Sequence, residues 1–321
     1  MMLWPDRASE RISVWFRELN GQPNLGELID KFARFQKMFE ERPAAHAFEA
    51  NPARNRCSYV SCVERSRVQL NWPRGAENNY IHANWISSPA EKRIIATQAP
   101  MPNTIDDFWR MVWQEKCEAI VMLNELTEGR GSCVPYWKLE NKTASGLIVK
   151  CGKTELMSKN NINLNVTEIT ISCPNEPSSK SRTVFHVQWH NWPENGVPAD
   201  FETAYLLFEF LSKFASFVVH SLIGTGRTGT LLCLMRAIYD LKEYGMVNVG
   251  SSLYSLRTER YRSVETNVQY LYIHGALVNY LHKFFKEKMI SPNPIDDKAL
   301  KAFNAKYKST IKELSQPTVK K

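Results

Sequence analysis

A glycine-rich turn stands between a short apolar run and a long helical stretch in the last third of the chain. The residues from Phe217 to His220 predict a buried strand, and those from Arg227 to about Tyr244 predict a helix. This order directs several backbone N–H groups and the positive end of a helix dipole at one point, which favours an anion. Arg227 adds a guanidinium whose paired donors match phosphate. We call the turn the anion loop, and its residues are Ser221, Leu222, Ile223, Gly224, Thr225 and Gly226.

The glycine spacing from Gly224 to Gly229 also fits a dinucleotide-binding fingerprint, Gly-x-Gly-x-x-Gly. An arginine inside the motif, its late position in the chain and the lack of alternating strand and helix patterns around it argue against this alternative. A dinucleotide-binding protein would be stabilised against heat by a nicotinamide cofactor. We therefore favour a phosphate group as the ligand of the anion loop, and we expect no cofactor.

The anion loop resembles the signature of the cysteine-dependent protein tyrosine phosphatases, His-Cys-x5-Arg-Ser/Thr-Gly. Ser221 stands where that family has its catalytic cysteine. The positions that match are His220, Gly224, Gly226, Arg227, Thr228 and Gly229. Further landmarks of the family occur in its order, at residues 79–84, 97–100, 108–113, 121–124, 136–137, 192–198 and 269–270. The likeness covers roughly residues 25 to 285, and within the family the chain is most similar to the tyrosine-phosphatase-like proteins of bracoviruses, the polydnaviruses of parasitoid wasps.

The resemblance implies an α/β fold, in which a highly twisted mixed sheet is flanked by helices. We expect an N-terminal helical extension over 1–24, a tyrosine-phosphatase-like domain over 25–285 and a basic C-terminal tail over 286–321. The apolar patterns predict helices over 9–19, 25–40, 200–213, 227–244, 251–260 and 267–286, with a further helix opening at 103. They predict strands over 68–70, 80–86, 93–97, 119–123, 147–151, 163–172, 182–189 and 217–220. Of these, 147–151, 163–172 and 182–189 read as an antiparallel meander.

Ser221 changes the chemistry that the resemblance implies. In active members a thiolate attacks phosphorus, and its surroundings lower its pKa to roughly 3.5–7.5. A serine hydroxyl stays protonated and needs an adjacent general base. His220 is next in sequence, but we expect it to point away from the pocket. The resemblance therefore implies an inactive homologue rather than an enzyme.

Three further site positions depart from the family pattern. Glu194, which follows Trp192 and Pro193, replaces the aspartic acid that protonates the leaving group, so the proton moves by one methylene. Cys57 replaces an aromatic residue that stacks on the phosphotyrosine ring. Glu265 places an anion beside the phosphate. We expect Glu265 to pair with Arg227 or otherwise to occupy the site, and so to weaken phosphopeptide binding.

Other positions keep the family pattern, among them Trp192, Thr228 and Gln269. Glu128 matches the acidic residue that orients the signature arginine, and either a working pocket or a structural salt bridge explains it. The departures together indicate a pseudophosphatase that binds phosphorylated or other signalling proteins. The resemblance to bracoviral proteins implies that these are proteins of a host cell and that the binding interferes with host immune-cell signalling. The alternatives are a weakly active phosphatase with an unusual mechanism and an interaction scaffold that does not use the pocket.

Charge and cysteine content limit the other classes of function. The formal charge of +8 favours anionic partners, and we expect phosphorylated proteins rather than nucleic acid. Much of the excess charge lies in the lysines after residue 297, which we interpret as a solvated helix and tail outside the catalytic body. The seven cysteines have irregular spacing without metal-binding pairs, which indicates reduced thiols and no metal site. The sequence shows neither a leader nor an apolar run of about 18 residues, so we expect no membrane span and a cytoplasmic protein, in the host cell if viral.

Overall fold

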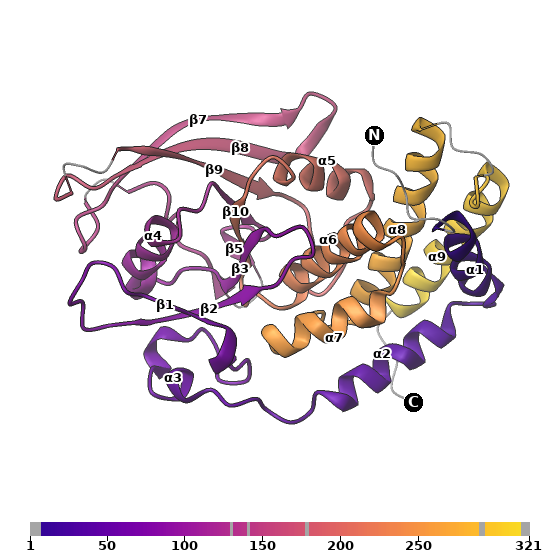
Figure 1. Cartoon of the computed structure of the whole chain (residues 1–321), viewed down its shortest axis with the longest axis horizontal. Helices are drawn as coiled ribbons and strands as arrows, with labels where there is room; N and C mark the ends of the chain where they lie inside the picture. The colour runs from indigo at the N-terminus through magenta and orange to yellow at the C-terminus, as the bar shows by residue number, and fades with distance from the viewer. Residues whose placement is uncertain (1–7, 129–130, 140–141, 177–179, 289–292, 316–321) are drawn as a thin grey trace.

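A computed structural model describes residues 8–128, 131–139, 142–176, 180–288 and 293–315. At its centre is an eight-stranded mixed sheet with the strand order β1-β2-β3-β10-β4-β9-β8-β7 (Figure 1). Its parallel central part consists of β3 (Arg93–Gln98), β10 (Ser216–Ser221), β4 (Ala119–Met122) and β9 (Arg182–Trp189). The antiparallel outer strands are β1 (Arg67–Gln69), β2 (Tyr80–Ile86), β8 (Asn161–Ser172) and β7 (Ile148–Ser158). The expected fold class is confirmed.

Strand β10 lies in the middle of the sheet, and all of its residues are buried. Phe217 and Val219 pack on one face, whereas Val218 packs on the other, as the two-residue period of a strand requires. A parallel strand covered on both faces has the continuous apolar pattern that the sequence shows. The end of β10 therefore carries the anion loop to the carboxyl edge of the parallel strands, where open α/β sheets bind ligands.

Helices cover both faces of the sheet. On one face α4 (Ile105–Gln114) packs with Phe108 and Trp109 against the sheet, together with Tyr136. The other face is covered by α5 (Glu202–Leu211), α6 (Gly226–Tyr244), α7 (Val249–Glu259) and α8 (Asn267–Glu287) (Figure 1). The larger core lies between these helices and the sheet, and it holds α6 rigidly behind the anion loop.

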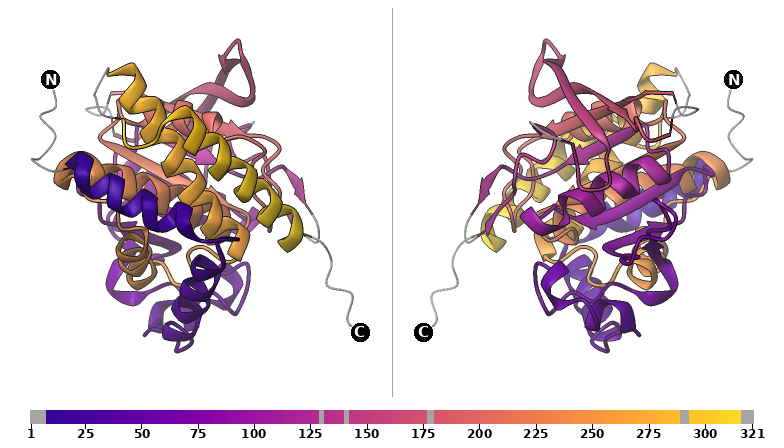
Figure 2. Two further views of the ribbon diagram at one scale, coloured as in Figure 1. Left: turned by 90° about the vertical axis from the view of Figure 1, so that its right-hand side faces the viewer. Right: turned by 90° about the vertical axis from the view of Figure 1, so that its left-hand side faces the viewer.

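Helices from both ends of the chain extend the larger core. They are α1 (Ala8–Gly21), α2 (Gly26–Met38) and α9 (Asp297–Leu314). Phe303 of α9 is fully buried, and its ring centroid lies 6.2 Å from that of Phe16 in α1. Figure 2 shows α1 in indigo and α9 in yellow on the same side of the molecule. The Lys306 ammonium donates hydrogen bonds to the carbonyls of Asn20 and Gln22. Our prediction that the basic segment lies outside the body is therefore wrong for α9, because one face of this helix is apolar and buried; residues 1–7, 289–292 and 316–321 lie outside the described residues.

The outer strands confirm the predicted antiparallel meander. Strand β7 runs to Ser158, well beyond the predicted end at Cys151, because its exposed residues show no burial pattern. Short elements escaped prediction for the same reason. They are α3 (His46–Glu49), β5 (Thr127–Glu128), β6 (Gly131–Ser132), and the 3₁₀ turns η1 (Pro52–Arg54), η2 (Glu64–Ser66) and η3 (Pro102–Thr104).

Several negative findings apply to the described part of the chain. No helix there is both long and apolar enough to cross a membrane. No group of three or more His, Cys, Asp or Glu side chains there is arranged to hold a metal ion. All seven cysteines are free thiols.

Candidate anion-binding site

The anion loop begins where β10 ends, at Ser221, and passes into α6 at Gly226. Gly224 has φ of 80°, a conformation that side chains disfavour. A Cβ atom at Gly224 would lie 2.1 Å from the carbonyl oxygen of Thr97 in β3. Glycine is therefore required at this position both by the backbone conformation and by the neighbouring strand.

Arg260 supports the anion loop from the interior. Its Nε donates to the carbonyl of Gly224 at 3.0 Å, and its Nη2 donates to the carbonyl of Ile223 at 3.2 Å. Its Nη1 donates to Asn84 Oδ1 at 2.8 Å. The guanidinium is fully buried, and burial lowers its pKa. Sequence reasoning missed Arg260, because nothing in the spacing of the motif shows that a residue 36 positions after Gly224 satisfies the loop carbonyls.

The hydroxyl of Ser221 is held by two donors. Its Oγ accepts hydrogen bonds from the Gly224 N–H at 3.2 Å and from the Thr228 hydroxyl at 3.0 Å. The residue is 3% exposed. Across residues 8–315, masked segments excepted, no carboxylate or imidazole forms a hydrogen bond with this hydroxyl. The group that would activate a serine nucleophile is therefore missing from the described surroundings of Ser221.

His220 points away from Ser221, as we expected. Its Nε2 lies 2.7 Å from the Tyr136 hydroxyl, which is also 2.9 Å from Nε2 of His186. Burial, and secondarily the neighbouring His186, lower the pKa of His220 well below its usual value. His220 is therefore a neutral core residue that cannot serve Ser221 as a base.

Arg227 forms a two-pronged ion pair with Glu128. Its Nη1 and Nη2 each donate to one carboxylate oxygen at 2.5 Å, and Nη1 also donates to the carbonyl of Trp192 at 3.1 Å. These bonds use three of the five N–H donors of the guanidinium. Within the described structure the Nε–H and one Nη2–H remain unpaired, and this pair of donors suits two oxygens of a phosphate group.

The segment that begins at Trp192 is hydrogen-bonded to Arg227, the residue that follows the anion loop. The Trp192 indole is 3% exposed, its ring centroid lies 4.6 Å from that of Trp189, and its N–H donates to the carbonyl of Gly196 at 3.2 Å. Glu194 is exposed at the tip of this segment. Because Arg227 binds the Trp192 carbonyl, the segment that carries Glu194 is tied directly to the anion-binding arginine.

Of the two arrangements that we expected for Glu265, pairing with Arg227 is not found; the carboxylate instead contacts the anion loop. Its Oε1 accepts a hydrogen bond from the Thr225 hydroxyl at 2.7 Å, and its Oε2 lies 2.5 Å from the place that a Cβ atom at Gly226 would occupy. Glu128 already neutralises Arg227, which is the physical reason for the difference. Burial raises the pKa of the Glu265 carboxyl, and the nearby Glu194 adds to this effect while Thr225 opposes it.

Gln269 fixes the backbone on which Glu265 stands. Its Oε1 accepts hydrogen bonds from the N–H groups of Glu265, at 2.9 Å, and Thr266, at 3.3 Å. Its buried Nε2 has no partner among the described residues. The geometry therefore gives Gln269 a positioning role at the first turn of α8 and leaves one amide donor beside Gly226.

The segment that carries Cys57 lies along β3, next to the anion loop. Gln98, which pairs with Ser221 in the sheet, accepts from the Arg56 N–H at 2.9 Å and donates to the Arg54 carbonyl at 2.9 Å. Cys57 is half-buried at the rim. Sequence reasoning missed the role of Gln98, because its two partners become neighbours only when the chain folds.

The predicted site residues thus meet at one end of the parallel sheet. A family model described as protein-tyrosine phosphatase matches residues 51–279. The chain belongs to the protein-tyrosine phosphatase family. This membership confirms the family that the anion loop indicated; it leaves open the finer likeness to bracoviral proteins and the chemical effect of Ser221.

Relatives of this protein-tyrosine phosphatase family member include human receptor-type tyrosine-protein phosphatase C, which is 31% identical over 292 residues, or 87% of this chain and 22% of the relative. The putative receptor-type tyrosine-protein phosphatase mosPTP-1 of Aedes aegypti is 33% identical over 251 residues, or 74% of this chain and 19% of the relative. The chain thus spans about a fifth of the length of these relatives.

Solved structures confirm the protein-tyrosine phosphatase fold. The structure of PTPN18 in complex with HER2-pY1196 phosphopeptides is similar to this chain with a TM-score of 0.74 and 23% identity, over 83% of this chain and 97% of the other. A second PTPN18 structure, from work on its recognition of distinct HER2 tyrosine phosphorylation sites, gives a TM-score of 0.73 and 24% identity, over 84% and 98% of the two chains. At these identities the likeness concerns the fold.

Proposed function

We propose that this protein is a catalytically inactive member of the family, which uses the anion loop to bind phosphorylated signalling proteins. The observation that carries the proposal is the contrast between two neighbouring side chains. The Ser221 hydroxyl accepts two hydrogen bonds and has no base among the described residues, whereas Arg227 is fixed by Glu128 with two donors still unpaired. Such a site retains the means to bind a phosphate group but has lost the activated nucleophile.

We further propose that the phosphorylated ligand is a phosphotyrosine-containing protein of a host cell, bound in the cytoplasm, and that binding interferes with immune-cell signalling. The likeness to bracoviral phosphatase-like proteins supports this finer assignment. The differences from the family pattern at Cys57, Glu194 and Glu265 accompany Ser221 and suit a chain in which catalysis is no longer selected. PTPN18 offers an example of the same fold in complex with phosphopeptides.

Removal of the Arg227 guanidinium tests the proposal. A tyrosine-phosphorylated peptide is expected to bind the wild type in preference to its unphosphorylated form, and Arg227→Met to bind it at least about 30-fold more weakly, since truncating one partner of a buried charge pair costs about 2 kcal/mol or more. Isothermal titration calorimetry measures both affinities. Arg93→Met is the matched control, because Arg93 is an exposed arginine at the far end of β3.

Unchanged binding in Arg227→Met would contradict use of the pocket and favour the interaction scaffold. Turnover of an aryl phosphate by the wild type that disappears in Arg227→Met would favour the weakly active phosphatase instead. Circular dichroism of each variant establishes that the fold is intact, because removing Arg227 leaves the Glu128 carboxylate without its partner.

Glu265 makes anion binding depend on pH. Burial raises the pKa of this carboxyl, so it is neutral below the raised value and carries a negative charge beside the anion loop above it. The affinity for sulfate is expected to fall by about fivefold to tenfold as the pH rises through the pKa of Glu265, because the charged carboxylate then repels the anion across a partly solvent-screened distance. Sulfate keeps its own charge over this range. Titrations of sulfate between about pH 5 and 8 measure the effect.

Glu265→Gln is expected to bind sulfate and the phosphotyrosyl peptide more tightly at neutral pH and to show a flat pH profile. Glu243→Gln serves as the control, because Glu243 is an exposed carboxylate in the last turn of α6, at the opposite end of this helix from the anion loop. Equal affinities of wild type and Glu265→Gln across the pH range would show that Glu265 does not restrict the site.

A further inference from the structure

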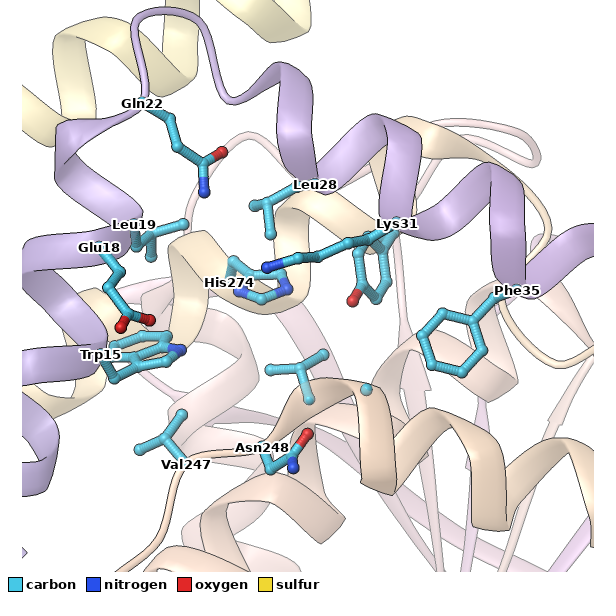
Figure 3. Close-up of a pocket in the computed structure, with 13 residues that line it drawn as sticks. Trp15, Glu18, Leu19, Gln22, Leu28, Lys31, Phe35, Val247, Asn248 and His274 are labelled. Carbon is cyan, nitrogen blue, oxygen red and sulfur yellow. The ribbon is translucent and has the colours of Figure 1, made fainter.

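A cavity of about 240 Å³ lies where α1 and α2 meet α8 and the start of α7 (Figure 3). It shares no lining residue with the anion loop. Its walls combine aromatic rings with polar side chains, and those that matter for its chemistry are Trp15, Gln22, Lys31, Phe35, Tyr270 and His274. Nothing in the proposed function of the anion loop uses this cavity.

His274 is the central polar group of the cavity. The residue is 5% exposed, and both of its ring nitrogens lack a hydrogen-bond partner among the described residues. Its ring is stacked on Trp15 with centroids 6.3 Å apart and lies edge-on to Tyr270 at 5.0 Å. Burial, with a smaller contribution from Lys31, lowers the pKa of His274 to about 3. The ring is therefore neutral at physiological pH and offers one N–H donor and one acceptor.

Gln22 adds a second unpaired group. It is 5% exposed, and its Oε1 has no partner in the described structure. Figure 3 shows the Gln22 amide extending from the α1–α2 connection into the space that the His274 ring faces. Buried polar groups are normally paired, and an unpaired one calls for a bound water or ligand. Two such residues in one cavity mark a site with a defined hydrogen-bonding demand.

That demand limits the ligand. The cavity presents two acceptors, Gln22 Oε1 and one His274 nitrogen, and one donor, the other His274 nitrogen. A flat molecule with an N–H next to a C=O supplies one donor and one acceptor along one edge, which pair with two of these three groups, and its faces suit the aromatic walls of Trp15 and Tyr270. Lys31 and Glu18 carry opposite charges in the lining, so neither sign of net charge is required of the ligand.

We propose that this cavity binds a small planar heteroaromatic molecule with a lactam edge, the chemistry of an oxopurine base, through His274 and Gln22. The volume suits one or two fused rings and is below that of most drug-sized ligand sites. Such a ligand would both pack against the aromatic rings and pair with the unpaired nitrogens of His274. A water molecule would only pair with the nitrogens.

The test uses the full chain with hypoxanthine as the probe and purine, which lacks the lactam carbonyl, as the matched ligand. Calorimetry is expected to show saturable binding of hypoxanthine to a single site and binding of purine that is about tenfold weaker, the effect of one to two lost hydrogen bonds. His274→Phe keeps the flat ring but removes both nitrogens, and we expect it to weaken hypoxanthine binding by at least about tenfold. Tyr244→Phe, an exposed ring in α6, is the control and should bind like the wild type.

The proposal fails if hypoxanthine shows no saturable binding to the wild type, which would make the cavity a hydrated one only. It also fails if purine binds as tightly as hypoxanthine, or if His274→Phe binds as tightly as the wild type. Should His274→Phe not fold, Gln22→Met carries the same test: weakened binding supports the site, and unchanged binding overturns it. Because the readout is hypoxanthine binding, its outcome is separate from that of the phosphopeptide experiment.

Discussion

Ser221→Cys is expected to hydrolyse p-nitrophenyl phosphate at least about 10³-fold faster than the wild type, since removal of a catalytic nucleophile costs up to about 10⁶-fold in other enzymes. The new thiol would stand at the end of β10, beside the Gly224 N–H and at the N-terminus of α6. Those surroundings lower the pKa of a cysteine and favour the nucleophilic thiolate. Glu128 already orients Arg227, whose remaining donors would hold the phosphate group.

p-Nitrophenyl phosphate is the informative substrate because its leaving group needs little protonation, so the position of Glu194 has a small effect on its rate. An alkyl or phenyl phosphate depends more on the general acid, and Ser221→Cys should be less active toward it. The control is the double variant Ser221→Cys with Arg227→Met, which should be inactive.

This expectation would be contradicted if Ser221→Cys still binds sulfate but does not hydrolyse p-nitrophenyl phosphate. That result would mean that the changes at Cys57, Glu194 and Glu265 prevent catalysis even after the sulfur nucleophile has been restored. In that case Glu265→Gln combined with Ser221→Cys is the next variant to assay, because Glu265 bonds directly to the anion loop through Thr225.

Gly224→Ala is expected to lower the free energy of unfolding by about 3 kcal/mol, the sum of left-handed backbone strain and a forced shift of packed structure. The added methyl group would lie 2.1 Å from the Thr97 carbonyl, a backbone atom of a central strand that cannot move aside freely. Urea denaturation with an unchanged m-value measures the loss of stability.

Gly75→Ala is a closely matched control. Gly75 has φ of 84° against 80° for Gly224, but a Cβ atom at Gly75 would meet no atom within 4 Å. Gly75→Ala should lower the free energy of unfolding by the left-handed backbone strain alone, about 1–2 kcal/mol. Equal losses for the two variants would show that the anion loop can yield to the added methyl group. A larger loss at Gly224 would show that β3 holds the loop in place.

Contacts from Arg260 and around Arg227 hold the anion loop in its conformation. A fully buried guanidinium binds the carbonyls of Ile223 and Gly224, while Glu128 and the Trp192 carbonyl fix Arg227. Each contact joins segments that are remote in sequence. The loop is thus held from below and from the side, which leaves its outer face available to an anion.

Prediction was most successful where the determinants are local. Strand, glycine-rich turn and helix follow one another between Val218 and Tyr244, so the direction of the backbone and the need for glycine are set within one short segment. The apolar run of β10 reflected its burial on both faces. The helical face of α9 was also readable, since Phe303, Tyr307 and Thr310 recur at helical spacing, but its many lysines led us to place it outside the body.

By itself, then, the sequence determined the family, the fold class and the position of the anion loop. The glycine-rich turn lies in one contiguous segment, and the family motifs follow one another along the chain in the expected order. Only the tertiary structure decided that Glu128 rather than Glu265 pairs with Arg227, that Arg260 and Gln98 hold the neighbouring segments, and that His274 and Gln22 face a shared cavity. These pairings depend on which side chains the fold brings within hydrogen-bond distance of each other and on which charges it buries together. Neither the distances nor the burial is set until the strands and helices have packed.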